Sequence, residues 1–198
     1  MNKINKFNLL KGFTLVELMV TVGIFVLMTG VLLARYGKFN HGIILTNLAY
    51  DTALTVRNAQ SYGLNVKSAP STGTSISYSN EFNFPYGVQF KDETSSFILY
   101  ADGNKNNKYD TGEAITTTNI KRGSKVSELC VGIEKNCSND VTELNIIFKR
   151  PDPVAHIFST SNTGTIKPEN AYAEITLQSI DGSIKKVVVR ATGQIGVK

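Results

Sequence analysis

The longest apolar run in this chain is FTLVELMVTVGIFVLMTGVLLA, residues 13–34. It contains a single charged residue, Glu17, and no proline. A helix of about 22 residues spans about 33 Å at 1.5 Å per residue, close to the hydrocarbon thickness of a bilayer. The run therefore predicts a transmembrane or filament-core helix over residues 13–35.

The residues before this run are basic, and the small residue that a peptidase would favour also precedes it. Residues 1–12, MNKINKFNLLKG, contain three lysines and no acid, and Arg35 and Lys38 follow the run. A secretory signal peptide should carry a small-residue cleavage site after its apolar run, whereas here Gly12 lies before it. The lysines predict a cytoplasmic leader over residues 1–12, with the residues beyond Lys38 on the other side of the membrane.

The helical pattern continues beyond the apolar run as one amphipathic stripe, which predicts a second helical segment over residues 36–63. Gly63 is a plausible end of a single helix over about 13–62. Apolar residues recur there at three- and four-residue spacing, namely Leu45, Leu48, Ala49, Ala53, Val56, Ala59 and Tyr62.

Short β-like runs follow from residue 72 onward. Asp181-Gly182 separates two of them and predicts a hairpin turn. Short connections favour antiparallel pairing, so we expect an α+β fold in which the helix packs on a mostly antiparallel β-sheet head over residues 64–198. The predicted strands are TSISYS (74–79), YGVQFK (86–91), SFILYA (96–101), LNIIFK (144–149), YAEITLQS (172–179), IKKVVVRA (184–191) and QIGV (194–197).

The segment Lys11-Gly12-Phe13-Thr14-Leu15-Val16-Glu17 resembles the prepilin signature of type IV pilins and type II secretion pseudopilins. The resemblance implies the pilin fold, cleavage after Gly12 by a prepilin peptidase, and N-methylation of the new terminal residue, Phe13. It also implies that Glu17 neutralises the amino terminus of a neighbouring subunit during assembly. A glutamate that snorkels to the head groups is the alternative, since a lone carboxylate in an apolar helix needs a partner.

The C-terminal layout looks like that of FimT/GspH-type minor pilins, through its strand order, its Asp-Gly hairpin and its terminal Gly-x-Ile. Some members of that group bind DNA through a Gly-Arg-x-Arg tail. The corresponding residues here, Gly193 to Gly196, contain no arginine, so DNA is a candidate partner that no basic tail supports. The absence of proline from the predicted helix favours a minor pilin or pseudopilin over a major pilin.

The segment ADGNKNNKYDTGEA, residues 101–114, has the ligand spacing of an EF-hand calcium loop without the flanking helices. Calcium is therefore a candidate ligand, and a polar hairpin turn is the alternative. The residues at positions 1, 3, 5, 7, 9 and 12 are Asp102, Asn104, Asn106, Lys108 (through its backbone carbonyl), Asp110 and Glu113.

The two cysteines, Cys130 and Cys137, predict a disulfide if the head is exported, and two free thiols if it is not. The sequence contains no G-x-S-x-G, Walker A or GxGxxG pattern, and we expect no enzymatic activity. The formal net charge of +5 includes the three lysines of the predicted leader, so it supports nucleic-acid binding only weakly.

The predicted function is structural, as a minor pilin or pseudopilin in a type IV pilus or type II secretion filament. Its expected partners are other pilins or pseudopilins, the prepilin peptidase, the inner-membrane assembly platform and membrane lipid. The expected location is the bacterial inner membrane, with the head outside the cytoplasm, and then the pilus or periplasmic pseudopilus. The alternative is a membrane-anchored or pilus-tip binding module, for DNA uptake or adhesion, with a calcium-stabilised head.

Overall fold

The computed structural model describes residues 12–65, 84–134, 136–164 and 166–198. The chain divides into two units, Met1–Asn40 and His41–Lys198, each of which is described by itself. Helix α1, Leu15–Leu64, contributes to both units and agrees closely with the predicted helix over 13–62.

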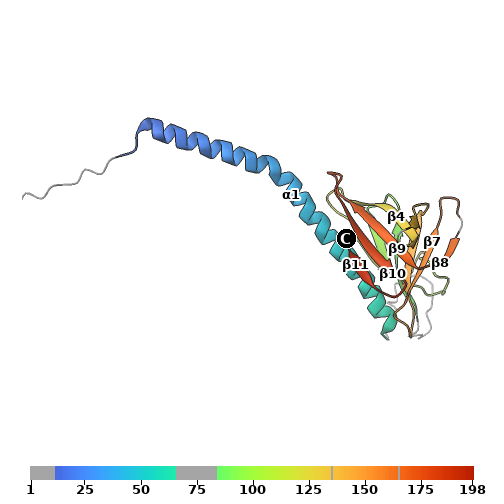
Figure 1. Cartoon of the computed structure of the whole chain (residues 1–198). Coiled ribbons are helices and arrows are strands. Elements are labelled where there is room, and N and C mark those ends of the chain that lie inside the picture. Colours follow the sequence, from blue (N-terminus) through green and yellow to red (C-terminus); the bar gives the residue numbers. More distant parts are fainter. Residues whose placement is uncertain (1–11, 66–83, 135, 165) are drawn as a thin grey trace, which may run out of the picture. The chain divides into compact units, whose positions relative to one another are not determined.

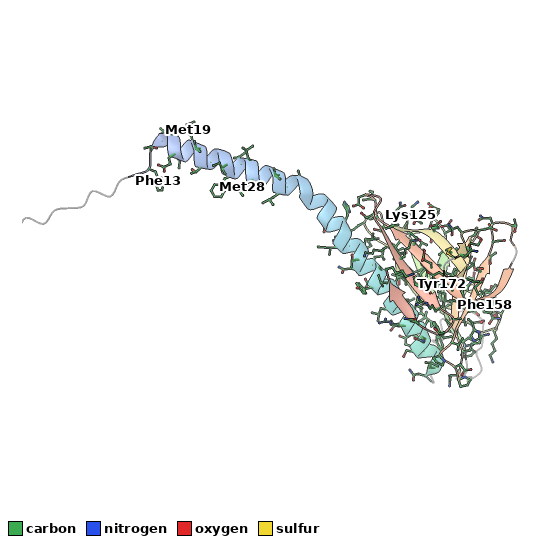
Figure 2. The ribbon with its side chains drawn as sticks, viewed as in Figure 1. Phe13, Met19, Met28, Lys125, Phe158 and Tyr172 are labelled. Carbon is green, nitrogen blue, oxygen red and sulfur yellow. A yellow bond between two sulfur atoms is a disulfide. The ribbon has the colours of Figure 1, made fainter. Side chains whose placement is uncertain are left out.

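The first unit presents an apolar helical surface on all sides. Leu15–Ala34 is long and apolar enough to cross a membrane, and none of it is buried. Phe13, Met19 and Met28 project from this part of the chain (Figure 2), with exposed fractions of 85%, 68% and 62%. An isolated helix of this composition lacks the polar face that a water-exposed helix carries.

The second unit combines the rest of α1 with two antiparallel sheets, whose strands are coloured from green to red along the chain (Figure 1). Among the described residues, sheet A has the order β3 (Ala114–Asn119), β2 (Ser96–Ala101), β1 (Tyr86–Lys91), β6 (Glu143–Phe148), β7 (Ala155–Thr160) and β8 (Ile166–Asn170). Sheet B has the order β11 (Ile195–Val197), β10 (Ile184–Arg190), β9 (Tyr172–Gln178), β4 (Lys125–Ile133) and β5 (Asn136–Ser138).

One core joins α1 to the facing sides of both sheets. The predicted helical stripe is confirmed, because its small and branched members are buried and Leu48 and Tyr62 pack at its edge. Alternate strand positions supply the rest, such as Val88 and Ile146 from sheet A and Ile175 and Val187 from sheet B. The buried helix residues are Leu45, Ala49, Ala53, Val56 and Ala59.

Among the described residues the expected α+β class and the antiparallel pairing of the strands are confirmed, but the head has two sheets where one was expected. The predicted runs at 86–91, 96–101, 144–149, 172–179, 184–191 and 194–197 are strands to within one residue at either end. The run at 74–79 lies outside the described residues. The Asp181-Gly182 turn joins β9 to β10 as predicted, with Gly182 at a φ of 83°.

Sequence reasoning missed β4 and β5, which complete sheet B, and β7 and β8, which extend sheet A. In β4 the alternation of buried and exposed residues is interrupted by a register shift between Val126 and Glu128, so its sequence does not show a regular period of two. Strand β4 also pairs with β9, which lies 40 or more residues away along the chain, and such distant pairing has no local signal.

Gly63 lies at a close approach of α1 to Phe148 of sheet A, and this contact generates a stability prediction. A Cβ atom at Gly63 would lie 2.6 Å from the carbonyl oxygen of Phe148 and 2.9 Å from its Cβ atom. We expect Gly63→Ala to lower the free energy of unfolding by about 1–3 kcal/mol through this overpacking. Urea denaturation of the full chain in detergent would measure it.

Gly42→Ala is the matched control, because it is the same change in the same helix with no atom within 4 Å of the new Cβ. Alanine is a better helix former than glycine by about 0.8–1.0 kcal/mol, so this variant should be more stable than the parent. If both variants shifted stability in the same direction, the close contact at Gly63 would not be the cause.

Candidate functional site

The residues of the predicted cleavage and assembly site lie at the exposed start of α1. Gly12 and Phe13 precede the helix, and Phe13 is 85% exposed. Glu17 lies in the first helical turn and is also exposed. Gly12, Phe13 and Glu17 therefore all lie at the surface of the first unit.

The start of α1 is set by a capping residue that sequence reasoning missed. The Thr14 hydroxyl oxygen accepts a hydrogen bond from the Glu17 backbone N–H at 3.2 Å, and the Thr14 carbonyl accepts from Leu18 N–H at 3.1 Å. Thr14 and Glu17 have the T-x-x-E spacing of a capping box, a sequence signal that could have located the helix start. Glu17 therefore sits where an acid also stabilises the positive end of the helix dipole.

The Asp/Asn-rich loop, residues 102–113, connects β2 to β3 and lies against the outer face of sheet A. Its Tyr109 ring packs edge-on against Tyr100 of β2, with ring centroids 5.7 Å apart. Tyr100 is fully buried, and a Cβ atom at Gly87 would lie only 2.8 Å from its ring. Glycine at position 87 is what leaves room for the Tyr100 ring beside it.

The predicted calcium ligands come together in this loop, but their oxygens accept hydrogen bonds from the loop itself. The Asp102 carboxylate accepts from the Asn106 and Asn107 backbone N–H groups at 3.0 and 2.9 Å. The Glu113 carboxylate accepts from the backbone N–H groups of Gly103 at 2.8 Å and Asp110 at 2.9 Å.

The asparagine side chains complete this network. The Asp110 carboxylate accepts from the side-chain amides of Asn104 at 2.8 Å and Asn106 at 2.6 Å. The Asn104 and Asn106 amide oxygens accept from the backbone N–H groups of Asn106 and Lys108, two residues further on in each case. The loop thus has the geometry of the hydrogen-bonded polar turn that was the alternative to a calcium loop.

Two of the loop's carboxylates are nevertheless buried close to each other. Asp102 is fully buried and Glu113 is 4% exposed. Burial raises the pKa of the Asp102 carboxyl, although backbone N–H groups offset part of the effect. Burial also raises the pKa of Glu113, and the neighbouring charge of Asp102 raises it further. A cation beside both carboxylates would relieve this repulsion.

The chemistry of the donor set suits calcium better than a transition metal. The side chains offer oxygen ligands, which calcium prefers, although Asp110 Oδ2 and Glu113 Oε1 already accept two hydrogen bonds each. Within the described residues no group of three or more His, Cys, Asp or Glu side chains is placed to hold a metal ion. Amide and backbone oxygens would therefore have to supply most of the coordination.

A buried polar network under the loop was also missed by sequence reasoning. Gln89 of β1 and Asn145 of β6 are partners in register, are about 4% and 3% exposed, and both donate to Glu143, at 2.8 and 3.0 Å. The Tyr100 hydroxyl donates to the Asn145 amide oxygen at 3.1 Å. The signal available in the sequence was an amide with an apolar residue on each side in each of two strands.

Cys130 of β4 and Cys137 of β5 form a disulfide, as predicted for an exported head. Their Cα atoms are 5.5 Å apart, and no free cysteine exists in the chain. The bond closes the β4–β5 hairpin at the edge of sheet B.

The disulfide should contribute to stability mainly by restricting the unfolded chain. The cysteines are 7 residues apart in sequence, and for a loop of about eight residues the chain-entropy model gives about 2.5 kcal/mol. We expect the double variant Cys130→Ser, Cys137→Ser to lose about this much unfolding free energy in urea. Adding a reductant should then destabilise the parent protein and leave the double variant unchanged, and equal stability of the two without reductant would contradict the prediction.

Comparisons with known proteins found no match among family models, curated proteins or solved structures.

Proposed function

We propose that this chain is a type IV pilin-like subunit with the pilin fold, a minor pilin or pseudopilin that joins a helical filament through α1. In this proposal a prepilin peptidase cuts between Gly12 and Phe13 and the new amino terminus is methylated. The role is structural and requires no catalytic residue of the chain itself.

The observation that carries the proposal is the unpartnered apolar helix in the first unit. Fifteen large apolar side chains between Phe13 and Leu33 are more than half exposed. Burying such a side chain is worth about 1.5–3 kcal/mol, so leaving all of them in water would cost more than about 20 kcal/mol. This exceeds the usual net stability of a domain, about 5–15 kcal/mol, so the segment requires lipid or other apolar helices.

The residues around this helix favour a filament over a simple membrane anchor. The motif Gly12-Phe13-Thr14-Leu15-Val16-Glu17 resembles the prepilin signature, and an anchor alone needs neither the glycine nor the acid. Glu17 is costly in lipid without a partner, and the amino group released at Phe13 of a neighbouring copy is a partner of opposite charge. The proposed partners are other pilins or pseudopilins, the prepilin peptidase, the inner-membrane assembly platform and membrane lipid. The proposed location is the bacterial inner membrane and then the filament.

Replacing Glu17 separates the docking charge from the helix cap. Glutamine at this position can still complete a capping box but carries no charge. If the charge drives assembly, Glu17→Gln and Glu17→Ala should both reduce the amount of chain in the filament fraction by about ten-fold or more, since 1.4 kcal/mol corresponds to a factor of ten. Immunoblotting of sheared filaments from the native cells measures this amount.

Thr14→Ala is the control for the cap, because it removes the hydroxyl acceptor and keeps the charge. Its fractional loss of helicity, measured by circular dichroism, should exceed its fractional loss of chain in the filament fraction. Glu17→Gln chains that assemble as well as the parent would show that Glu17 acts as a cap rather than as a docking charge.

The buried carboxylates of the Asp/Asn-rich loop support a second proposal, a calcium-stabilised head in a membrane-anchored or pilus-tip binding module for adhesion or DNA uptake. Calcium would add to the hydrogen-bonded loop and neutralise Asp102 and Glu113. Asp102, Asn104, Asn106, Asp110 and Glu113, with the Lys108 carbonyl, would hold it.

Calcium binding predicts a thermal shift of the full chain in detergent. At ten times its Kd, calcium should stabilise the head by about 1.4 kcal/mol relative to chelator, which for this chain length is a shift of a few degrees in Tm. Asp110→Asn should abolish the shift, while Asp152→Asn, the same change at an exposed acid outside the loop, should not. An unchanged midpoint of the parent between calcium and chelator would rule out the site.

A further inference from the structure

The turn between β9 and β10 lies toward the His41 end of the second unit (Figure 1). Strand β11 begins beside Arg57 of α1, which donates to the Ile195 carbonyl, and ends beside Tyr50, which lines a shallow pocket together with Val197. Strand β11 therefore runs back along the helix. Strand β10 pairs with β11 in the antiparallel sense, so the turn that precedes β10 lies further still in the direction of His41.

The Asp181 carboxyl in this turn supports the same position. The Ser183 backbone N–H is the main cause that lowers the pKa of Asp181, and His41 of α1 lowers this pKa as well. Charges have such effects mainly over a few ångströms. The turn therefore lies beside His41, the residue at which the second unit begins.

This turn, residues 180–184, exposes two large apolar side chains and is called the hairpin tip below. Ile180 is 71% exposed and Ile184 is 53% exposed. Within the described sheets and their connections, Ile133 is the one other large apolar side chain that is more than half exposed. A single exposed apolar residue is ordinary, whereas two on one turn form a small apolar surface.

Two cations lie on the loop beside the hairpin tip. Lys121 and Arg122 of the β3–β4 connection are exposed. A Cβ atom at the next residue, Gly123, would lie 3.3 Å from the Cδ1 atom of Ile180, so this loop and the tip are in contact. In the described part of the chain no acid lies within 4 Å of either cation.

The acids at this end of the head leave the tip positively charged. Lys125, labelled in Figure 2, pairs with Glu93 and opposes Gln178, just before the tip. The Asp181 carboxylate is the one acid of the tip, and it accepts two hydrogen bonds from within the turn. Lys185 follows the tip and adds a further positive charge. The surface is thus apolar with a basic rim.

The length of the chain brings a bilayer surface within reach of this tip. His41 follows Ala34, the end of the apolar segment, by seven residues, which cover about 10 Å as a helix and at most about 25 Å when extended. The head-group layer is itself roughly 5–8 Å thick on each side of a bilayer. Anionic lipids attract Lys and Arg near the surface, and apolar side chains enter the boundary between head groups and acyl chains.

We propose that the hairpin tip docks on an anionic lipid surface, with Ile180 and Ile184 at the head-group boundary and Lys121 and Arg122 against the lipid phosphates. The proposal rests on the insertion of α1 in a membrane, as in the proposed function, and is independent of the filament. The docked tip gives the head a second contact with the bilayer, so the head is oriented before the chain leaves the membrane.

A single introduced tryptophan tests this contact, because the chain contains none. Full-length Ile180→Trp is reconstituted in phosphatidylcholine vesicles with and without phosphatidylglycerol, using lipids brominated high on the acyl chain as quenchers. Its emission should shift to the blue and be quenched, more strongly with phosphatidylglycerol. Ile133→Trp is the matched control, since Ile133 is equally exposed but lies at the opposite end of β4. Its emission should not be quenched.

The charge of the rim is tested by the double change Lys121→Gln, Arg122→Asn in the Ile180→Trp background. Asparagine tolerates the φ of 61° at position 122. The ratio of docked to free heads on phosphatidylglycerol vesicles should fall by about ten-fold or more, and high salt should lower it in the parent. Near-ultraviolet circular dichroism checks that the variants remain folded.

Leu27→Trp, in the apolar part of α1, separates failure of the docking from failure of the anchor. Quenching of Leu27→Trp without quenching of Ile180→Trp would overturn the docking and leave the proposed function standing. If neither is quenched, membrane insertion of α1 is wrong and the docking falls with it.

Two further results would overturn the docking. One is equal quenching at positions 133 and 180, which would show that the head has no preferred face toward the lipid. The other is a blue shift of Ile180→Trp without bromine quenching that grows with the protein-to-lipid ratio. That result would assign the hairpin tip to a second copy of the chain.

Discussion

The structure depends on one constraint, that the two halves of helix α1 have different surroundings. Over Leu15–Ala34 helix α1 is apolar on every side, whereas over residues 41–64 it is apolar on the side that packs against the sheets. The two halves differ in side-chain size for this reason. Large residues are favoured where lipid or neighbouring helices surround the chain, and alanines at 49, 53 and 59 let the second half approach the strands closely.

The second half of α1 also fixes the C-terminal end of the chain, which passes beside the helix (Figure 1). The Gln60 side-chain amide donates to the carbonyl oxygens of Pro153 and Gly193, at 3.0 and 3.2 Å, and Arg57 donates to Ile195. A Cβ atom at Gly193 would lie 2.3 Å from the Pro153 carbonyl oxygen, so only glycine fits there. Polar residues on the helix thus satisfy backbone carbonyls in the β6–β7 connection and at the start of β11.

The parts that could be predicted from sequence are those with a local physical cause. The α1 stripe and the strands β1, β2, β9 and β10 follow from periodicity, and the cysteine pair was predicted from its short spacing on the expectation that the head is exported. The second sheet could not be predicted, because β4 finds its partner β9 across a long stretch of chain and carries a register shift. The hydrogen bonds of the Asp/Asn-rich loop could not be predicted either, since the burial of Asp102 and Glu113 depends on how the loop folds.

The proposed docking role of Glu17 is compatible with its place in the first turn, because the residue that caps α1, Thr14, follows the proposed cleavage site. Thr14 accepts the Glu17 N–H bond from within the mature chain, so removal of residues 1–12 leaves the helix start in place. Cleavage would instead add a positive amino group at Phe13, next to the positive end of the helix dipole. The Glu17 carboxylate in the first turn can offset the charge of the amino group of its own chain or of a neighbouring chain. In an apolar environment the pairing is strong in either case, and filament growth would follow from satisfying it between copies.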